Sequence, residues 1–96
     1  MNKQYTSVWD ALEDTQQPAE NMKVRSQLAR ELSAHIKKKG LNQTEAAKLL
    51  NVTQPRVSDL INGKINLFSI DTLINMIVTM GLHISNIEIS EEIAAY

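Results

Sequence analysis

The chain of 96 residues contains no cysteine. Without thiols it cannot form a disulfide-stapled scaffold, a zinc site with thiolate ligands or a cysteine nucleophile. It also lacks long apolar runs, and its first ten residues, MNKQYTSVWD, contain no hydrophobic targeting stretch, so we expect neither a membrane span nor a signal peptide. The length fits one small domain, and 43% hydrophobic residues are enough for a core. These features predict one soluble intracellular domain.

Catalytic constellations are missing as well. The sequence has serine, histidine and aspartate, yet it shows no nucleophile elbow, glycine-rich phosphate loop or pair of carboxylates that would join them in a reaction. The two histidines, His35 and His83, have no acidic or histidine neighbour at the spacing of a metal site. The sequence therefore predicts a protein that is not an enzyme and that holds neither a metal nor a cofactor.

Charge is distributed unevenly along the chain. Between Lys23 and Lys64 the sequence has nine basic and three acidic residues, a net charge of +6, and the remaining residues carry −7 within a formal total of −1. A basic middle between acidic ends is typical of a surface that faces a polyanion, with flanks that avoid nucleic acid or meet a basic partner. The charges alone leave open a solvated surface whose charges happen to segregate.

The first part of the chain predicts an arm and then a long helix. Residues 1–18 are mostly polar, and we expect an arm with a short helical turn. Pro18 suits the start of a helix over about 19–39, because proline lacks an N–H group that the first turn would leave unpaired. Three lysines and Gly40 end this helix. Apolar residues at every fourth position predict its buried stripe: Val24, Leu28, Leu32 and Ile36.

A short helix is expected next. Asn42 and Glu45 have the spacing of a capping box, in which each side chain bonds the backbone N–H of the other residue, and they predict a helix over about 43–50. Helices of this length are marginal in water on their own, so this one must pack on its neighbours. Asn51 follows it and tolerates the left-handed conformation that a tight turn requires.

Two more helices, a short strand and a tail are expected after this turn. Thr53 caps a helix over about 54–62. Ser69 caps another helix over about 70–80, which ends at a glycine. Residues 83–89 are rich in β-branched side chains and predict a short strand whose edge needs a partner, such as the same strand of a second copy. Residues 90–96 are expected to form a tail.

The two short helices have the features of a helix-turn-helix. Its two helices approach each other closely only where a small residue lies between them, and Ala47 meets this need. The apolar residues that would lock the pair are Ala46, Leu50, Val52, Val57 and Leu60. The other side chains are polar and predicted to face outward: Gln43, Thr44, Lys48, Gln54, Arg56, Ser58, Asp59 and Asn62. A purely structural helical hairpin is the alternative.

This segment resembles the XRE, or lambda-repressor/Cro-like, superfamily in the stretches LNQTEAA (41–47) and VSDLINGK (57–64). Asn51 departs from the family pattern, which usually has glycine there. Together with SVWDALED and NLFSIDTLINMIVTMGL, the chain is similar to compact HigA-type antitoxins and their orphan relatives over about residues 7–89. The resemblance implies a mainly all-α, five-helix domain over 19–89, with the helix-turn-helix at 43–62 and a C-terminal strand used in dimerisation.

The resemblance also implies roles for individual residues on double-stranded DNA. The helix from Gln54 is expected to enter the major groove, where each base pair shows a distinct pattern of donors and acceptors. The residues expected to contact bases are Gln54, Pro55, Arg56, Ser58 and Asp59. The residues expected to contact the DNA backbone are Asn42, Gln43, Thr44, Lys48, Thr53, Asn62 and Lys64. Ile84, Ile87 and Ile89 are expected to form the homodimer interface.

Three functions remain to be separated. The first is a dimeric, sequence-specific repressor that binds a palindromic operator in the cytoplasm, at the nucleoid, of a prokaryote or phage. The second is a HigA-like antitoxin that also neutralises a small basic ribonuclease toxin and represses its own operon, an idea that the acidic periphery favours. The third is a structural or RNA-binding helical adaptor, because basic helices tolerate many polyanions.

Overall fold

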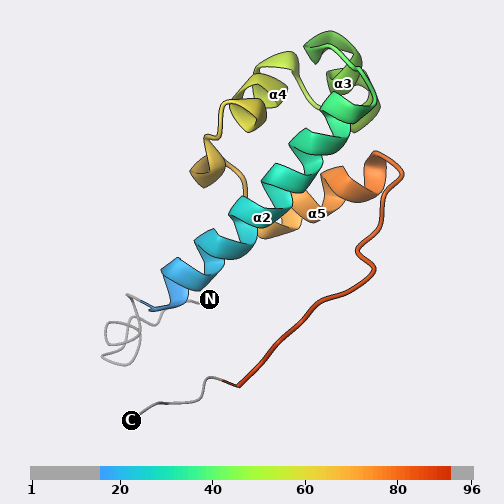
Figure 1. The fold of residues 1–96 in the computed structure, drawn as a ribbon. Helices are drawn as coiled ribbons and strands as arrows, with labels where there is room; N and C mark the ends of the chain where they lie inside the picture. Colours follow the sequence, from blue (N-terminus) through green and yellow to red (C-terminus); the bar gives the residue numbers. More distant parts are fainter. Residues whose placement is uncertain (1–15, 92–96) are drawn as a thin grey trace.

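The computed structural model describes residues 16–91, which are mainly helical (Figure 1). The elements are, in order, α2 (Gln16–Lys38), α3 (Gln43–Leu50), α4 (Gln54–Ile61), the 3₁₀ turn η1 (Ile65–Leu67) and α5 (Ile70–Thr79). α2 is the long spine of the fold, α5 packs along it, and α3 and α4 pack near its C-terminal half. The predicted all-α class is confirmed for this part of the chain. Most of the predicted arm and the end of the predicted tail, 1–15 and 92–96, lie outside the described residues.

α2 differs from its prediction at the N-terminus and in its buried stripe. It begins at Gln16, three residues before the predicted start, and Pro18 lies within its first turn, where no backbone N–H is needed. Ala29, Leu32 and Ile36 are buried, whereas Val24 is 40% exposed. A spacing of four residues exceeds the 3.6 residues of a helical turn, so a stripe at every fourth position rotates around the helix and leaves the core.

The starts of the three shorter helices follow the sequence closely. In α3, Glu45 donates its N–H to Oδ1 of Asn42 over 2.8 Å, and Asn42 donates its N–H to Oε1 of Glu45 over 2.9 Å, which completes the capping box. The side-chain oxygens of Thr53 and Ser69 cap α4 and α5. Each accepts a hydrogen bond from the backbone N–H three positions later in the chain. Because a cap is a local contact between neighbours in the chain, these boundaries were predictable.

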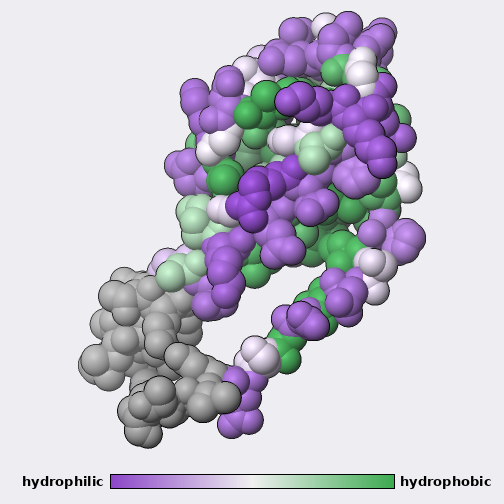
Figure 2. Space-filling view, viewed as in Figure 1, coloured by the Kyte–Doolittle hydropathy of each residue, from purple (hydrophilic) through white to green (hydrophobic). Residues whose placement is uncertain are grey.

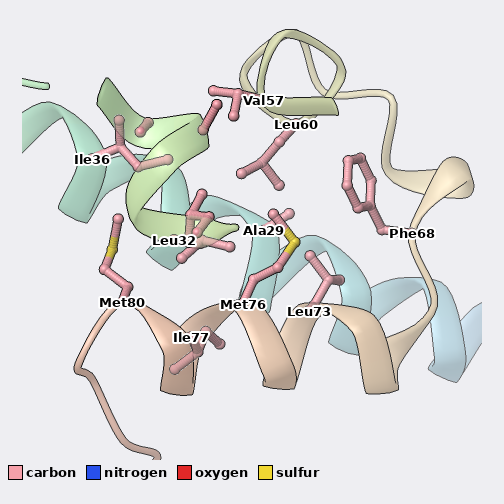
Figure 3. Close-up of a cluster of buried hydrophobic side chains, with 13 residues drawn as sticks. Ala29, Leu32, Ile36, Val57, Leu60, Phe68, Leu73, Met76, Ile77 and Met80 are labelled. Carbon is pink, nitrogen blue, oxygen red and sulfur yellow. The ribbon is translucent and has the colours of Figure 1, made fainter. Parts of the chain in front are cut away.

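One apolar core joins all four described helices. Figure 3 shows side chains of α2, α4 and α5 gathered in one cluster, in which Leu60 of α4 points toward Ala29 of α2 and Met76 of α5. The largest fully buried side chains are Phe68, Leu32, Leu73 and Val57. No polar or charged side chain is buried among the described residues, so burial of apolar surface holds these helices together.

The predicted strand over 83–89 is not formed. Residues 82–91 continue from α5 as an extended chain without regular structure and run away from the helices (Figure 1). A strand requires a hydrogen-bonded neighbour, and the described chain places none beside this segment. Ile87 and Ile89 are 72% and 91% exposed as a result. No helix in the described range is long and apolar enough to cross a membrane.

Candidate nucleic-acid interface

The turn between α3 and α4 fixes the angle between the two helices. Asn51 adopts the left-handed conformation with φ of 59°, as its position predicted. Its neighbour Val52 donates its N–H to the carbonyl oxygen of Ala47 over 3.0 Å, so the chain turns sharply at the end of α3. Ala46 and Ala47 are buried beneath this turn, and their small side chains allow α4 to approach. The geometry of a helix-turn-helix follows from these contacts.

One side of α4 is polar and faces away from the core. Val57 and Leu60 are buried, so a helix of 3.6 residues per turn places the opposite side chains toward solvent. On that side Pro55 and Asn62 are exposed and Ser58 and Asp59 are half-buried, and Gln54 lies exposed beside them in the first turn. Figure 2 shows hydrophilic side chains gathered over the α3 and α4 end of the molecule. The structure therefore brings together four of the five predicted base-contacting residues, all except Arg56, on the side of α4 that faces away from the core.

Gln54 is held at the front of this face by α3. The hydroxyl of Thr44 lies 3.4 Å from Oε1 of Gln54 and donates a hydrogen bond to it. Oε1 keeps a second lone pair, and both amide N–H groups stay available, so the side chain can still form paired hydrogen bonds with a ligand. The contact also shows that the N-terminal turns of α3 and α4 lie close together.

Arg56 lies apart from the other predicted base-contacting residues. Its Nη1 donates to the carbonyl oxygen of Leu67 over 3.0 Å, and its guanidinium carbon lies 4.1 Å from the centroid of the Phe68 ring. Both partners belong to the segment between α4 and α5. No local pattern in the sequence predicts this contact, because a hydrogen bond across 11 positions depends on how the intervening segment folds.

Lys64 extends the polar face beyond the end of α4. Its Nζ lies 3.9 Å from Oδ1 of Asp59, and its side chain is 60% exposed. The backbone N–H of Lys64 also donates to the carbonyl oxygen of Asp59 over 2.9 Å. Asp59 therefore pairs with Lys64. Asn62 is fixed by a bond from its Nδ2 to Oγ of Ser58 over 3.2 Å.

Four of the predicted backbone-contacting residues lie at helix N-termini: Asn42, Gln43 and Thr44 at α3 and Thr53 at α4. Asn42 and Thr53 use their side-chain oxygens as acceptors in caps, which leaves the Nδ2 group of Asn42 and the hydroxyl proton of Thr53 as donors. Gln43 and Thr44 belong to the first turn of α3, where unpaired N–H groups and the helix dipole favour an anion. Lys48 is exposed in the last turn of the same helix.

The described residues offer no cluster of three histidine, cysteine or acidic side chains that could hold a metal ion. The chemical groups of the polar face are amides, hydroxyls, one carboxylate and lysine ammonium groups. Such groups form hydrogen bonds with base edges and phosphates, and this face presents them on the outer surface of a helix narrow enough for a DNA groove.

Comparisons with known proteins agree with this geometry. A helix-turn-helix domain family matches residues 11–90. A solved structure described as a "Putative XRE Family Transcriptional Regulator" is 30% identical, with a TM-score of 0.70, over 82% of this chain and 88% of that one. No curated protein matches. The family consists of DNA-binding proteins rather than enzymes, as the sequence predicted. The chain belongs to the XRE-type helix-turn-helix family.

Proposed function

We propose that the protein is a sequence-specific transcriptional regulator that inserts α4 into the major groove of double-stranded DNA. The observation that carries this proposal is the exposed polar face of α4, supported from behind by Val57 and Leu60 in the core. The major groove admits one helix and presents a different pattern of donors and acceptors for each base pair. The similarity to a solved XRE regulator supports the same function.

In this proposal the residues of the face divide into two groups. Gln54 pairs with adenine, Pro55 and Ser58 add contacts to base edges, and Asp59 accepts from cytosine. The DNA backbone is contacted by Asn42, Gln43, Thr44, Lys48, Thr53, Asn62 and Lys64. Phosphate contacts fix the position of the protein but do not choose a sequence. Arg56, which the sequence placed in the first group, faces Leu67 and Phe68 instead.

A homodimer would place two such helices on one palindromic site. Two recognition helices about 34 Å apart meet successive turns of the major groove on the same side of the duplex. Ile84, Ile87 and Ile89 lie on the extended C-terminal segment, with exposures of 38%, 72% and 91%. Their exposure supports pairing of this segment with its copy, because a second chain would supply the hydrogen-bonded neighbour that one chain lacks.

Selection of binding sites from random duplex DNA tests the proposal. We expect a palindrome, with affinity that falls by about 0.9 log units per log unit of salt for each phosphate contacted. The control is a scrambled duplex of the same composition, which should bind more weakly at every salt concentration. Equal affinity for both duplexes, or a preference for RNA, would contradict sequence-specific reading of DNA and favour the adaptor function.

An antitoxin of the HigA type is the second candidate function. In the C-terminal segment the acidic Glu88 lies between the exposed Ile87 and Ile89, and Glu91 follows two positions after Ile89. A segment with apolar and acidic side chains suits a basic protein partner as well as a second copy. Co-purification with a basic ribonuclease encoded by an adjacent gene would support this candidate, and a solitary gene with harmless neighbours would contradict it.

A further inference from the structure

Two arginines hold the segment between α4 and α5. Arg56 of α4 donates to the carbonyl oxygen of Leu67 over 3.0 Å, and Arg25 of α2 donates to the carbonyl oxygen of Phe68 over 3.4 Å. The guanidinium of Arg56 also lies over the ring of Phe68, 4.1 Å from its centroid. The ring itself is fully buried. Neighbouring carbonyls of one short segment are thus bound from two different helices.

The position of Arg56 on α4 agrees with this role. Residues four apart on a helix lie on the same side, and Leu60, four positions after Arg56, is buried. Gln54 and Ser58 form another such pair on the polar face of α4, away from that side. Arg56 therefore projects from the flank of the helix. To reach a base edge, its side chain would have to leave the Leu67 carbonyl and uncover the Phe68 ring.

We propose that Arg56 is a positioning residue that sets the distance between the polar face of α4 and the Lys64 ammonium group, rather than a residue that reads guanine. This inference rests on the proposed function and assigns a role within it. Planar guanidinium groups stack on aromatic rings and donate in fixed directions, so one side chain can hold a backbone carbonyl and a ring at the same time. Leu67, whose carbonyl oxygen Arg56 holds, donates its own N–H to the carbonyl oxygen of Lys64 over 3.1 Å, and Lys64 contacts the DNA backbone in the proposal.

The positioning role and the base-reading role predict different changes in specificity. Loss of a guanine contact would reduce the ratio of affinities for the selected and scrambled duplexes by roughly 5- to 150-fold. Loss of a positioning contact weakens binding to both duplexes by the same factor. We therefore expect Arg56→Gln to leave this ratio within about twofold of wild type and to recover the same sequence in binding-site selection. A lost preference for guanine at one position would overturn the inference.

A double-mutant cycle tests the link to Lys64. If Arg56 positions that lysine, Lys64→Ala should reduce affinity less in the Arg56→Gln background than in wild type, because the lysine is already displaced. Arg30→Gln is the matched control: it removes the same charge from an exposed site on α2, and its effect should add to that of Lys64→Ala. Additive effects for Arg56 and Lys64 would overturn the inference.

Hydrogen exchange on the protein without DNA tests whether Arg56 holds the segment between α4 and α5. The amides of Leu67 and Phe68 are hydrogen-bonded to Lys64 and Ile65 within the segment, and we expect them to exchange faster in Arg56→Gln than in Arg30→Gln. Amides of α3 should be unchanged, which separates a local effect from unfolding. If Arg56→Gln does not fold, Arg56→Lys, which keeps the charge but not the planar group, replaces it, and the amides of Leu67 and Phe68 should again exchange faster than in Arg30→Gln. Unchanged exchange at these two amides would overturn the positioning role of Arg56. A wild-type protein that selects no DNA sequence would instead contradict the proposed function.

Discussion

At the scale of single residues, Asn51 shows how the turn constrains the sequence. It is the non-glycine residue with positive φ, 59°, in the described part of the chain. The left-handed region is costly for most L-residues because the β-carbon approaches the carbonyl oxygen, but asparagine visits it more readily. Asn51 is exposed, so its identity matters through the backbone and not through packing.

Substitution of Asn51 should therefore affect stability according to backbone preference alone. Asn51→Ala is expected to lower the free energy of unfolding by about 1–2 kcal/mol, and Asn51→Gly to leave it nearly unchanged. Thermal denaturation would measure this, since 1 kcal/mol shifts the midpoint by about 4–8 °C in a domain of this size. Equal loss in both variants would show that the asparagine side chain itself is needed.

Gln54 is the residue whose substitution should change base preference most clearly. It is exposed at the front of α4 and is oriented by the hydroxyl of Thr44. We expect Gln54→Ala to reduce discrimination at one adenine position by about 1–3 kcal/mol in competition titrations with base-substituted duplexes. Gln27→Ala, at an exposed site on α2, is the matched control and should leave discrimination unchanged.

At the scale of elements, the capping box of α3 connects sequence to structure most directly. Asn42 and Glu45 exchange two hydrogen bonds across one helical turn, and the helix begins where these residues predict. Eight residues are too few for a stable isolated helix, so the caps and the packing of Ala46, Ala47 and Leu50 must act together.

Removal of this cap should destabilise the domain measurably. Asn42→Ala is expected to cost about 0.5–2 kcal/mol in denaturant unfolding without DNA. Combined with Glu45→Ala, the total loss should be smaller than the sum of the two single losses, because both bonds belong to one motif. Asn75→Ala, at an exposed site of α5, serves as the control and should cause no loss. Strictly additive losses for Asn42 and Glu45 would show that the two bonds act independently.

The sequence predicts elements that are defined by contacts between residues close together in the chain. It does not predict features that depend on residues far apart in the chain. Caps and helix ends depend on residues a few positions apart, and the bounds of α3 agree with the prediction. A strand over 83–89 depends on a neighbour that the sequence of the segment cannot specify, and it is not formed in the single chain. Likewise, the helical pattern identified the polar face of α4, but the partners of Arg56 depend on the segment beyond the helix.

At the scale of the whole molecule, the folded body and the C-terminal segment should respond separately to mutation. Ile87 and Ile89 are 72% and 91% exposed, so they contribute little to the stability of one chain. We expect Ile87→Glu with Ile89→Glu to leave circular dichroism and the unfolding midpoint of the monomer unchanged. The same variant should reduce dimer formation in sedimentation and weaken binding to a palindrome more than binding to a half-site. An unchanged sedimentation profile would place the dimer interface elsewhere.

The core contains only apolar side chains in the described residues, and the polar face of α4 contributes none of them. A chain built in this way can exchange Gln54, Ser58 or Asp59 for other polar residues while Val57 and Leu60 keep the helix in place. In the proposed function, a few replacements on this side of α4 would therefore change the DNA sequence that the protein selects and leave its fold intact.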